Sequence, residues 1–160
     1  MIKCAIIMLI SLALESIINL NISFTSYLVP LFSLLSLILI YKFLKYNKKE
    51  YFIFAIVSGF IYDLVFTNFY VLNSVLFLLN SFIIYFYFKK MKYNLLNIIL
   101  ITIICSSMYN LMLFTLFNIF SYSTYSFLDF SYILGHFIII NVIYIILGYI
   151  LLNKTKLKEY

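Results

Sequence analysis

The sequence contains few charged residues and no arginine. Only 10% of its 160 residues are charged, 66% are hydrophobic, and all eleven basic residues other than histidine are lysine. Such a composition cannot be arranged as a water-soluble core beneath a polar surface. We therefore interpret the chain as an integral membrane protein. A helix that crosses the hydrocarbon layer takes roughly 20 residues, so we expect residues 1–160 to form a single transmembrane domain with no room for a soluble one.

Residues that build disulfide, metal, phosphate and catalytic sites are also scarce. Cys4 and Cys105 are the only cysteines, and both lie in apolar sequence, which excludes a disulfide framework or a cysteine metal site. Three glycines are too few and too scattered for a phosphate-binding loop. With one histidine and no arginine, the sequence contains no recognisable set of nucleophile, base and orienting group. We expect no catalytic residues, no metal and no cofactor, and hence a protein that is not an enzyme.

Six apolar runs follow one another between polar breaks. They cover about residues 4–20, 25–44, 51–67, 70–88, 94–119 and 130–152. The first run follows Lys3 as a signal peptide would, but Glu15 interrupts it and no small-residue cleavage site follows, so we expect a retained helix. The predicted fold class is an all-α integral membrane protein, a bundle of six transmembrane helices.

The lysines alternate from one break to the next. In a six-span arrangement all of them fall on one side: Lys3, Lys42, Lys45, Lys48, Lys49, Lys89, Lys90, Lys92, Lys154, Lys156 and Lys158. Cytoplasmic loops of membrane proteins carry an excess of lysine, so both termini are expected to be cytoplasmic. The same rule accounts for the net charge of +6. Because the loops are too short for a binding module, we expect the lipid bilayer and no nucleic acid as a partner.

Four ionisable side chains lie within or at the edge of the apolar runs: Glu15, Asp63, Asp129 and His136. A charged group at the bilayer centre costs roughly 2.5–3.5 kcal/mol, so these groups should face protein and not lipid. At 1.5 Å per residue, Glu15 lies about 18 Å and Asp63 about 20 Å from the cytoplasmic side, and His136 about 10 Å below the outer surface. All of them are expected in the outer half of the bilayer.

Helical spacing places several of the polar residues on shared faces. Gly59 and Asp63 are four residues apart, and the missing side chain at Gly59 would let another helix approach closely. Ser106 and Asn110 are also four apart. Since polar side chains in lipid find partners across helices, we predict a bundle held together by internal hydrogen bonds.

Three interpretations remain open for Asp63: a helix-packing residue, a contact to a partner, or part of a ligand or ion site. Glu15 has the same three. His136 is either a hydrogen-bonded core residue or a proton relay. With Asn110, Glu15 and His136 form the predicted intramembrane polar cluster.

The segment from Gly59 to Ser74, GFIYDLVFTNFYVLNS, resembles the bacterial rod-shape-determining MreD family. A Gly-x-x-x-Asp step, here Gly59 and Asp63, ends the third run, a short turn follows, and the fourth run begins with the small polar pair Asn73 and Ser74. The six spans, the cytoplasmic termini and the position of Pro30 also fit the family. The resemblance implies that Gly59, Asp63, Asn73 and Ser74 shape a packing or partner face.

The resemblance further implies a non-catalytic adaptor in the bacterial cell (inner) membrane. MreD-like proteins associate with the single-span protein MreC, support the RodA glycosyltransferase and a class B penicillin-binding protein in peptidoglycan synthesis, and are coupled indirectly to MreB filaments. The expected function is therefore support of cell elongation and cell shape.

Two alternatives remain. Substrate-binding S components of energy-coupling-factor vitamin transporters are also small six-span bundles, and an outward-facing cavity could use Glu15, Asp63, Asn73, Asn110 and His136. The run 4–20, however, lacks the small-residue motifs by which S components dock to their transport partner. The other alternative is a small membrane protein of unrelated function.

Overall fold

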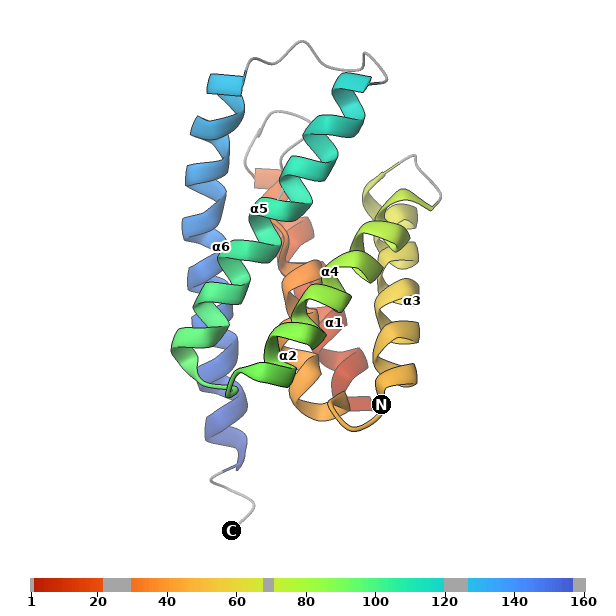
Figure 1. Cartoon of the computed structure of the whole chain (residues 1–160), viewed down its shortest axis with the longest axis vertical. Coiled ribbons are helices and arrows are strands. Elements are labelled where there is room, and N and C mark those ends of the chain that lie inside the picture. The colour runs from red at the N-terminus through yellow and green to blue at the C-terminus, as the bar shows by residue number, and fades with distance from the viewer. Residues whose placement is uncertain (1, 22–29, 68–70, 120–126, 157–160) are drawn as a thin grey trace.

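The computed structural model of the chain describes residues 2–21, 30–67, 71–119 and 127–156, without the side chains of 20–21, 127–134, 136 and 154–156. Nearly all of these residues are helical. The helices are α1 (Ile2–Asn21), α2 (Phe32–Leu44), α3 (Lys48–Phe66), α4 (Leu72–Lys90), α5 (Leu95–Ile119) and α6 (Phe127–Lys156), and no strand occurs in the described ranges (Figure 1). The prediction of an all-α chain is confirmed.

The helix boundaries follow the apolar runs, with one exception. Five helices begin and end within four residues of their expected limits, whereas α2 begins at Phe32 and not near residue 25. Pro30 and Leu31 precede α2 and are not helical. A proline disfavours helical geometry in the residue before it and supplies no N–H, so a helix start just after Pro30 is physically reasonable. Residues 22–29, the rest of the expected second span, lie outside the described residues.

The two ends of the bundle differ in charge. α1 begins and α6 ends at the same end, where α2 also leads into α3 and α4 leads into α5 (Figure 1). These are the breaks that carry the lysines. α3 ends and α4 begins at the opposite end, which holds Asp63 in the last turn of α3. The sequence breaks that carry lysine therefore lie at one end of the bundle, and the break between α3 and α4, which has none, lies at the other end.

The shortest helix, α2, lies at the centre of the bundle. It contacts each of the other five helices, and eleven of its thirteen residues are buried. Most of these are leucine and isoleucine, together with the small polar residues Ser33 and Ser36. A helix that is apolar on every side is expected to be surrounded by other helices, so α2 forms the axis against which the rest pack.

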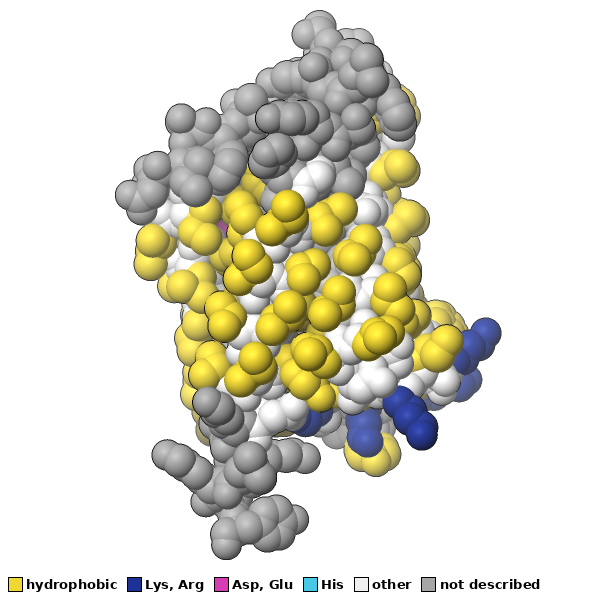
Figure 2. Space-filling view, turned by 90° about the vertical axis from the view of Figure 1, so that its left-hand side faces the viewer, with side chains coloured by type: hydrophobic (Ala, Val, Ile, Leu, Met, Phe, Trp, Pro, Cys, Tyr) yellow, Lys and Arg dark blue, Asp and Glu magenta, His cyan; other side chains and the backbone are white. Residues whose placement is uncertain are grey.

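The outer surface of the bundle carries a broad belt of apolar side chains. Viewed from the side of α6, hydrophobic side chains cover the middle of the molecule, and the visible lysines gather at one end (Figure 2). Leu9, Leu64 and Leu96, for example, expose 59–65% of their surface. Among the residues that the structure describes, three helical segments are long and apolar enough to cross a membrane: Ile2–Asn19, Leu72–Lys90 and Leu95–Ile119. The apolar segments Phe32–Leu44 and Phe137–Asn153 are shorter.

Candidate functional site

Asp63 caps the N-terminus of α4. Its Oδ2 accepts hydrogen bonds from the backbone N–H groups of Asn73 at 3.0 Å and Ser74 at 3.4 Å. Its Oδ1 accepts from the Asn73 side-chain amide at 2.7 Å and from the Thr67 hydroxyl at 2.8 Å. The N-cap residue, Val71, has no side-chain acceptor, so a carboxylate from α3 takes this role. Unpaired N–H groups and the positive end of the helix dipole both favour a carboxylate there.

Gly59 lies at a close approach of α3 and α4. A Cβ atom built on Gly59 would stand 2.6 Å from the backbone oxygen of Asn73 and 2.6 Å from Cα of Ser74. These are backbone atoms, which cannot move aside as a flexible side chain would. Because Gly59 has no side chain, the start of α4 can lie this close to α3. Asp63 follows Gly59 by one helical turn, so its carboxylate is within hydrogen-bonding distance of the start of α4.

Glu15 performs the corresponding role for α2. The Glu15 side chain of α1 is fully buried, and its Oε2 accepts the backbone N–H of Ser33 at 2.8 Å and the Ser33 hydroxyl at 2.5 Å. Leu31, the N-cap residue of α2, has no side-chain acceptor. Because α2 starts inside the bundle, its first N–H groups are away from water and need a partner from another helix.

Asn141 of α6 supplies a third cap. Its Oδ1 accepts the backbone N–H of Leu31 at 3.2 Å, and its Nδ2 donates to the Ser106 hydroxyl of α5 at 3.2 Å. Asn141 is fully buried. The start of α2 is therefore held from two sides, by Glu15 of α1 and by Asn141 of α6.

Tyrosines join the two capping carboxylates. The Tyr109 hydroxyl of α5 donates to Asn73 Oδ1 at 2.5 Å, while the Asn73 amide donates to Asp63. Tyr62 of α3 interacts with both Tyr109 and Glu15. Hydrogen bonds thus join Asp63, Asn73 and Tyr109, and electrostatic interactions of Tyr62 extend this buried network to Glu15. It connects α1, α3, α4 and α5 in the half of the bundle away from the lysines.

Of the two groups of site residues predicted from the sequence, the structure brings together the first but not the second. Gly59, Asp63, Asn73 and Ser74 form one contiguous contact between α3 and α4. Glu15 and Asn110 are both buried, but no hydrogen bond joins them among the described residues. The side chains of His136 and Asp129 lie outside the described residues.

Four buried polar atoms have no hydrogen-bond partner within the described part of the chain: Glu15 Oε1, Ser74 Oγ, Asn80 Oδ1 and Asn110 Nδ2. Of these residues, Glu15 and Ser74 take part in the capping contacts through Glu15 Oε2 and the Ser74 backbone N–H, and Asn80 Nδ2 donates to the backbone oxygen of Leu76 at 2.9 Å. The same ranges contain no group of three or more His, Cys, Asp or Glu side chains that could hold a metal ion.

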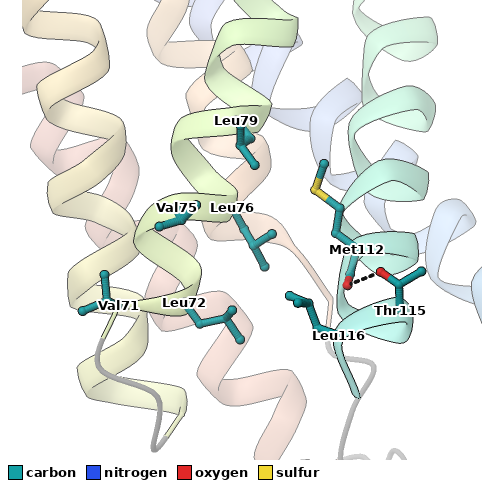
Figure 3. Close-up of a pocket in the computed structure, with 8 residues that line it drawn as sticks. All are labelled: Val71, Leu72, Val75, Leu76, Leu79, Met112, Thr115 and Leu116. Carbon is teal, nitrogen blue, oxygen red and sulfur yellow. Dashed lines mark hydrogen bonds between the residues drawn. The ribbon is translucent and has the colours of Figure 1, made fainter. Parts of the chain in front are cut away.

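An apolar groove lies between α4 and α5, beside the start of α4. It has a volume of about 610 Å³ and is lined by Val71, Leu72, Val75, Leu76, Leu79, Met112, Thr115 and Leu116 (Figure 3). The hydroxyl of Thr115, the only polar side chain in the lining, donates to the backbone oxygen of Met112 at 2.8 Å. The groove therefore presents apolar surface and no free hydrogen-bonding side chain.

Sequence reasoning did not identify Tyr109 as a member of the buried network, or Ser33 and Asn141 as residues that bond at the start of α2. Asn141 could have been recognised from the sequence, because it is the one side-chain amide in the apolar run 130–152. Tyr109 is one of 16 tyrosines and Ser33 one of many serines, and neither stands out by type or spacing. Their roles depend on which helices meet.

Comparison with known proteins finds no matching protein family, no matching curated protein and no matching solved structure. The fold and the site define an all-α protein with apolar helices of membrane-spanning length, whose buried carboxylates and amides cap and join its own helices.

Replacing Tyr109 with phenylalanine tests the connection between α4 and α5. We expect Tyr109→Phe to lower the free energy of unfolding by about 1–2 kcal/mol, because Asn73 Oδ1 loses its donor in a buried site while the ring is retained. Tyr87→Phe is the matched control. The Tyr87 hydroxyl makes a long, part-buried bond of 3.4 Å to Asn97, so its loss should change stability by less than about 0.5 kcal/mol. Denaturation in detergent micelles measures both, and equal effects would contradict the network.

Proposed function

We propose that the protein is a non-catalytic membrane adaptor of the bacterial cell-elongation complex, resembling MreD. In this proposal its six helices span the inner membrane, both termini are cytoplasmic, and helix contacts with an MreC-like protein support RodA and its class B penicillin-binding protein. The coupling to MreB is indirect.

One observation carries the proposal: the two buried carboxylates of the described chain serve the architecture of the bundle. Asp63 caps α4 and Glu15 caps α2, each through hydrogen bonds to backbone N–H groups. An adaptor needs a bundle of defined shape with an apolar outer surface, because helix association in lipid depends on close van der Waals packing. The four residues that carry the resemblance to MreD also form the contact between α3 and α4: Gly59, Asp63, Asn73 and Ser74.

The groove between α4 and α5 is the surface that best suits a partner's helix. Its lining is apolar, and the hydroxyl of Thr115, its one polar side chain, already donates to the backbone oxygen of Met112 (Figure 3). An apolar helix of a single-span protein could place its side chains there without burying an unpaired polar group.

The proposal is tested by depleting the protein from its native host and measuring cell width and length. We expect cells to widen or become round. Re-expression of the wild-type chain should restore the shape, and re-expression of Leu79→Trp, which fills the groove, should not. Ile104→Trp is the control, because Ile104 is as exposed as Leu79 but lies outside the groove lining. Unchanged cell shape on depletion would contradict the adaptor function.

The second candidate is a substrate-binding component of a vitamin transporter. One observation favours it. Two residues of the predicted polar cluster, Glu15 and Asn110, each have a buried atom without a hydrogen-bond partner among the described residues, namely Glu15 Oε1 and Asn110 Nδ2. Growth that depends on an added vitamin after depletion, with normal cell shape, would support this candidate over the adaptor.

A further inference from the structure

The described part of the bundle end that carries the lysines has a large net positive charge. The structure describes eight lysines there, which we call the lysine face: Lys3, Lys42, Lys45, Lys48, Lys49, Lys89, Lys90 and Lys92. Glu50 is the one acidic side chain described at this end, since Glu15 and Asp63 are buried towards the other. A single carboxylate cannot neutralise eight ammonium groups. Their mutual repulsion favours any anion that comes within reach.

Part of the lysine face is built on an aromatic cluster where three helix ends converge. Tyr41 at the end of α2 packs against Tyr51 of α3 and against Tyr85 and Phe88 of α4, with ring centroids 5.3–6.1 Å apart. Lys48 lies over the Tyr85 ring at 5.5 Å. These contacts hold the lysines of the α2–α3 connection close to the last turn of α4, which ends with Lys89 and Lys90.

The lysine face also borders directly on the apolar belt. Ile53 of α3 exposes 60% of its surface and Phe86 of α4 exposes 57%, each within about one turn of the nearest lysine in sequence. Tyr46, whose ring lies 4.5 Å from Lys45 Nζ, is 84% exposed. An exposed tyrosine beside lysines at the edge of an apolar belt is the arrangement found at the height of lipid headgroups.

We propose that the lysine face binds anionic phospholipid headgroups in preference to zwitterionic ones. A phospholipid matches both parts of the surface, because its phosphate meets the exposed ammonium groups while its acyl chains lie along the apolar belt beside Ile53 and Phe86. Clusters of four to eight lysines next to membrane helices attract anionic lipid, with a contribution that corresponds to roughly fivefold per engaged lysine. This inference concerns the end of the bundle opposite to the groove and does not depend on the adaptor function.

The test uses the purified full-length chain in nanodiscs that contain equal amounts of phosphatidylglycerol and phosphatidylcholine. Native mass spectrometry measures the ratio of the two lipids that remain bound. We expect at least about fivefold enrichment of phosphatidylglycerol in low salt. The enrichment should fall as NaCl is raised from about 0.05 M to about 0.5 M, because salt screens exposed charges.

Two matched variants assign the effect to these lysines. The triple variant Lys45→Gln, Lys48→Gln, Lys49→Gln should lose most of the enrichment, and the triple variant with arginine at the same positions should keep it. Circular dichroism and the unfolding temperature establish that both variants are folded. The salt dependence of the wild-type chain gives an independent answer if the glutamine variant does not fold.

Three results would overturn the proposal. The first is no enrichment in the wild-type chain, and the second is equal enrichment in the folded glutamine variant. The third is complete displacement of phosphatidylglycerol by an equal concentration of soluble glycerol 3-phosphate, which would assign the lysines to a free anion. If the first result is obtained, binding of a polyglutamate peptide would assign the lysine face to an acidic protein segment.

Discussion

Asp63→Leu is expected to destabilise the bundle by about 3–5 kcal/mol. The substitution removes the acceptor for the backbone N–H groups of Asn73 and Ser74 and for the Asn73 side-chain amide. These donors are buried, and each unpaired buried group costs about 1–3 kcal/mol. In a membrane, no water is available to replace the carboxylate.

Asp63→Asn separates the loss of the acceptor from the loss of the charge. Asparagine keeps one acceptor oxygen but directs an amide N–H₂ towards other donors, so we expect a loss of about half that of Asp63→Leu. Leu64→Ala is the matched control on the same helix, because Leu64 is exposed on the apolar belt and its truncation should have little effect. Unfolding by SDS in mixed micelles measures the four proteins. If Asp63→Leu were as stable as Leu64→Ala, Asp63 would not be the cap of α4.

Gly59→Ala is expected to be destabilising although alanine is the better helix former. Alanine contributes about 1 kcal/mol of helix propensity relative to glycine. Against this, its Cβ would lie 2.6 Å from two backbone atoms at the start of α4, and inserting a methyl group into a packed interface costs about 1–3 kcal/mol or more. The helices must separate, which also lengthens the hydrogen bonds to Asp63. We therefore expect a net loss of stability, and a larger loss for Gly59→Leu.

Alanine substitutions at the other two glycines, Gly135 and Gly148, serve as controls for Gly59→Ala. A Cβ atom on Gly148 would meet only the end of the Leu39 side chain, which can change rotamer, so Gly148→Ala should be close to neutral. A Cβ atom on Gly135 would meet nothing within 4 Å, so Gly135→Ala should be neutral or stabilising by up to about 1 kcal/mol. Unfolding of the three alanine variants under one condition should give the order Gly59, Gly148, Gly135 from least to most stable. Equal stability of the three would contradict the close approach of α3 and α4.

The network also predicts that Gly59 and Asp63 do not act independently. Both residues contact the start of α4, and residues that share a contact usually show non-additive effects on stability. In the double variant Gly59→Ala, Asp63→Leu, the loss should be smaller than the sum of the two single losses, because the first substitution already weakens the contact that the second removes.

The start of α2 marks the limit of what the apolar pattern could predict. The run 25–44 indicated one span, whereas the helix begins at Phe32, inside the bundle, with its first N–H groups bound by Glu15 and Asn141. Within the described part of that run, Pro30 and Leu31 are not helical although both are apolar, and hydropathy alone does not distinguish them from residues of the helix. The presence of Pro30 was a local signal for the boundary.

The sequence alone determined the all-α class, the limits of five of the six helices to within four residues, the gathering of lysine at one end, and the shared face of Gly59 and Asp63. All of these follow from local properties, namely hydropathy, charge and helical period. The tertiary structure decided that α2 is central and that Glu15, Asp63 and Asn141 cap helices other than their own. It also decided that Tyr109 of α5 bonds to Asn73 of α4. Such pairings depend on how helices rotate and cross one another, and a period of 3.6 residues specifies a face without specifying which helix it meets.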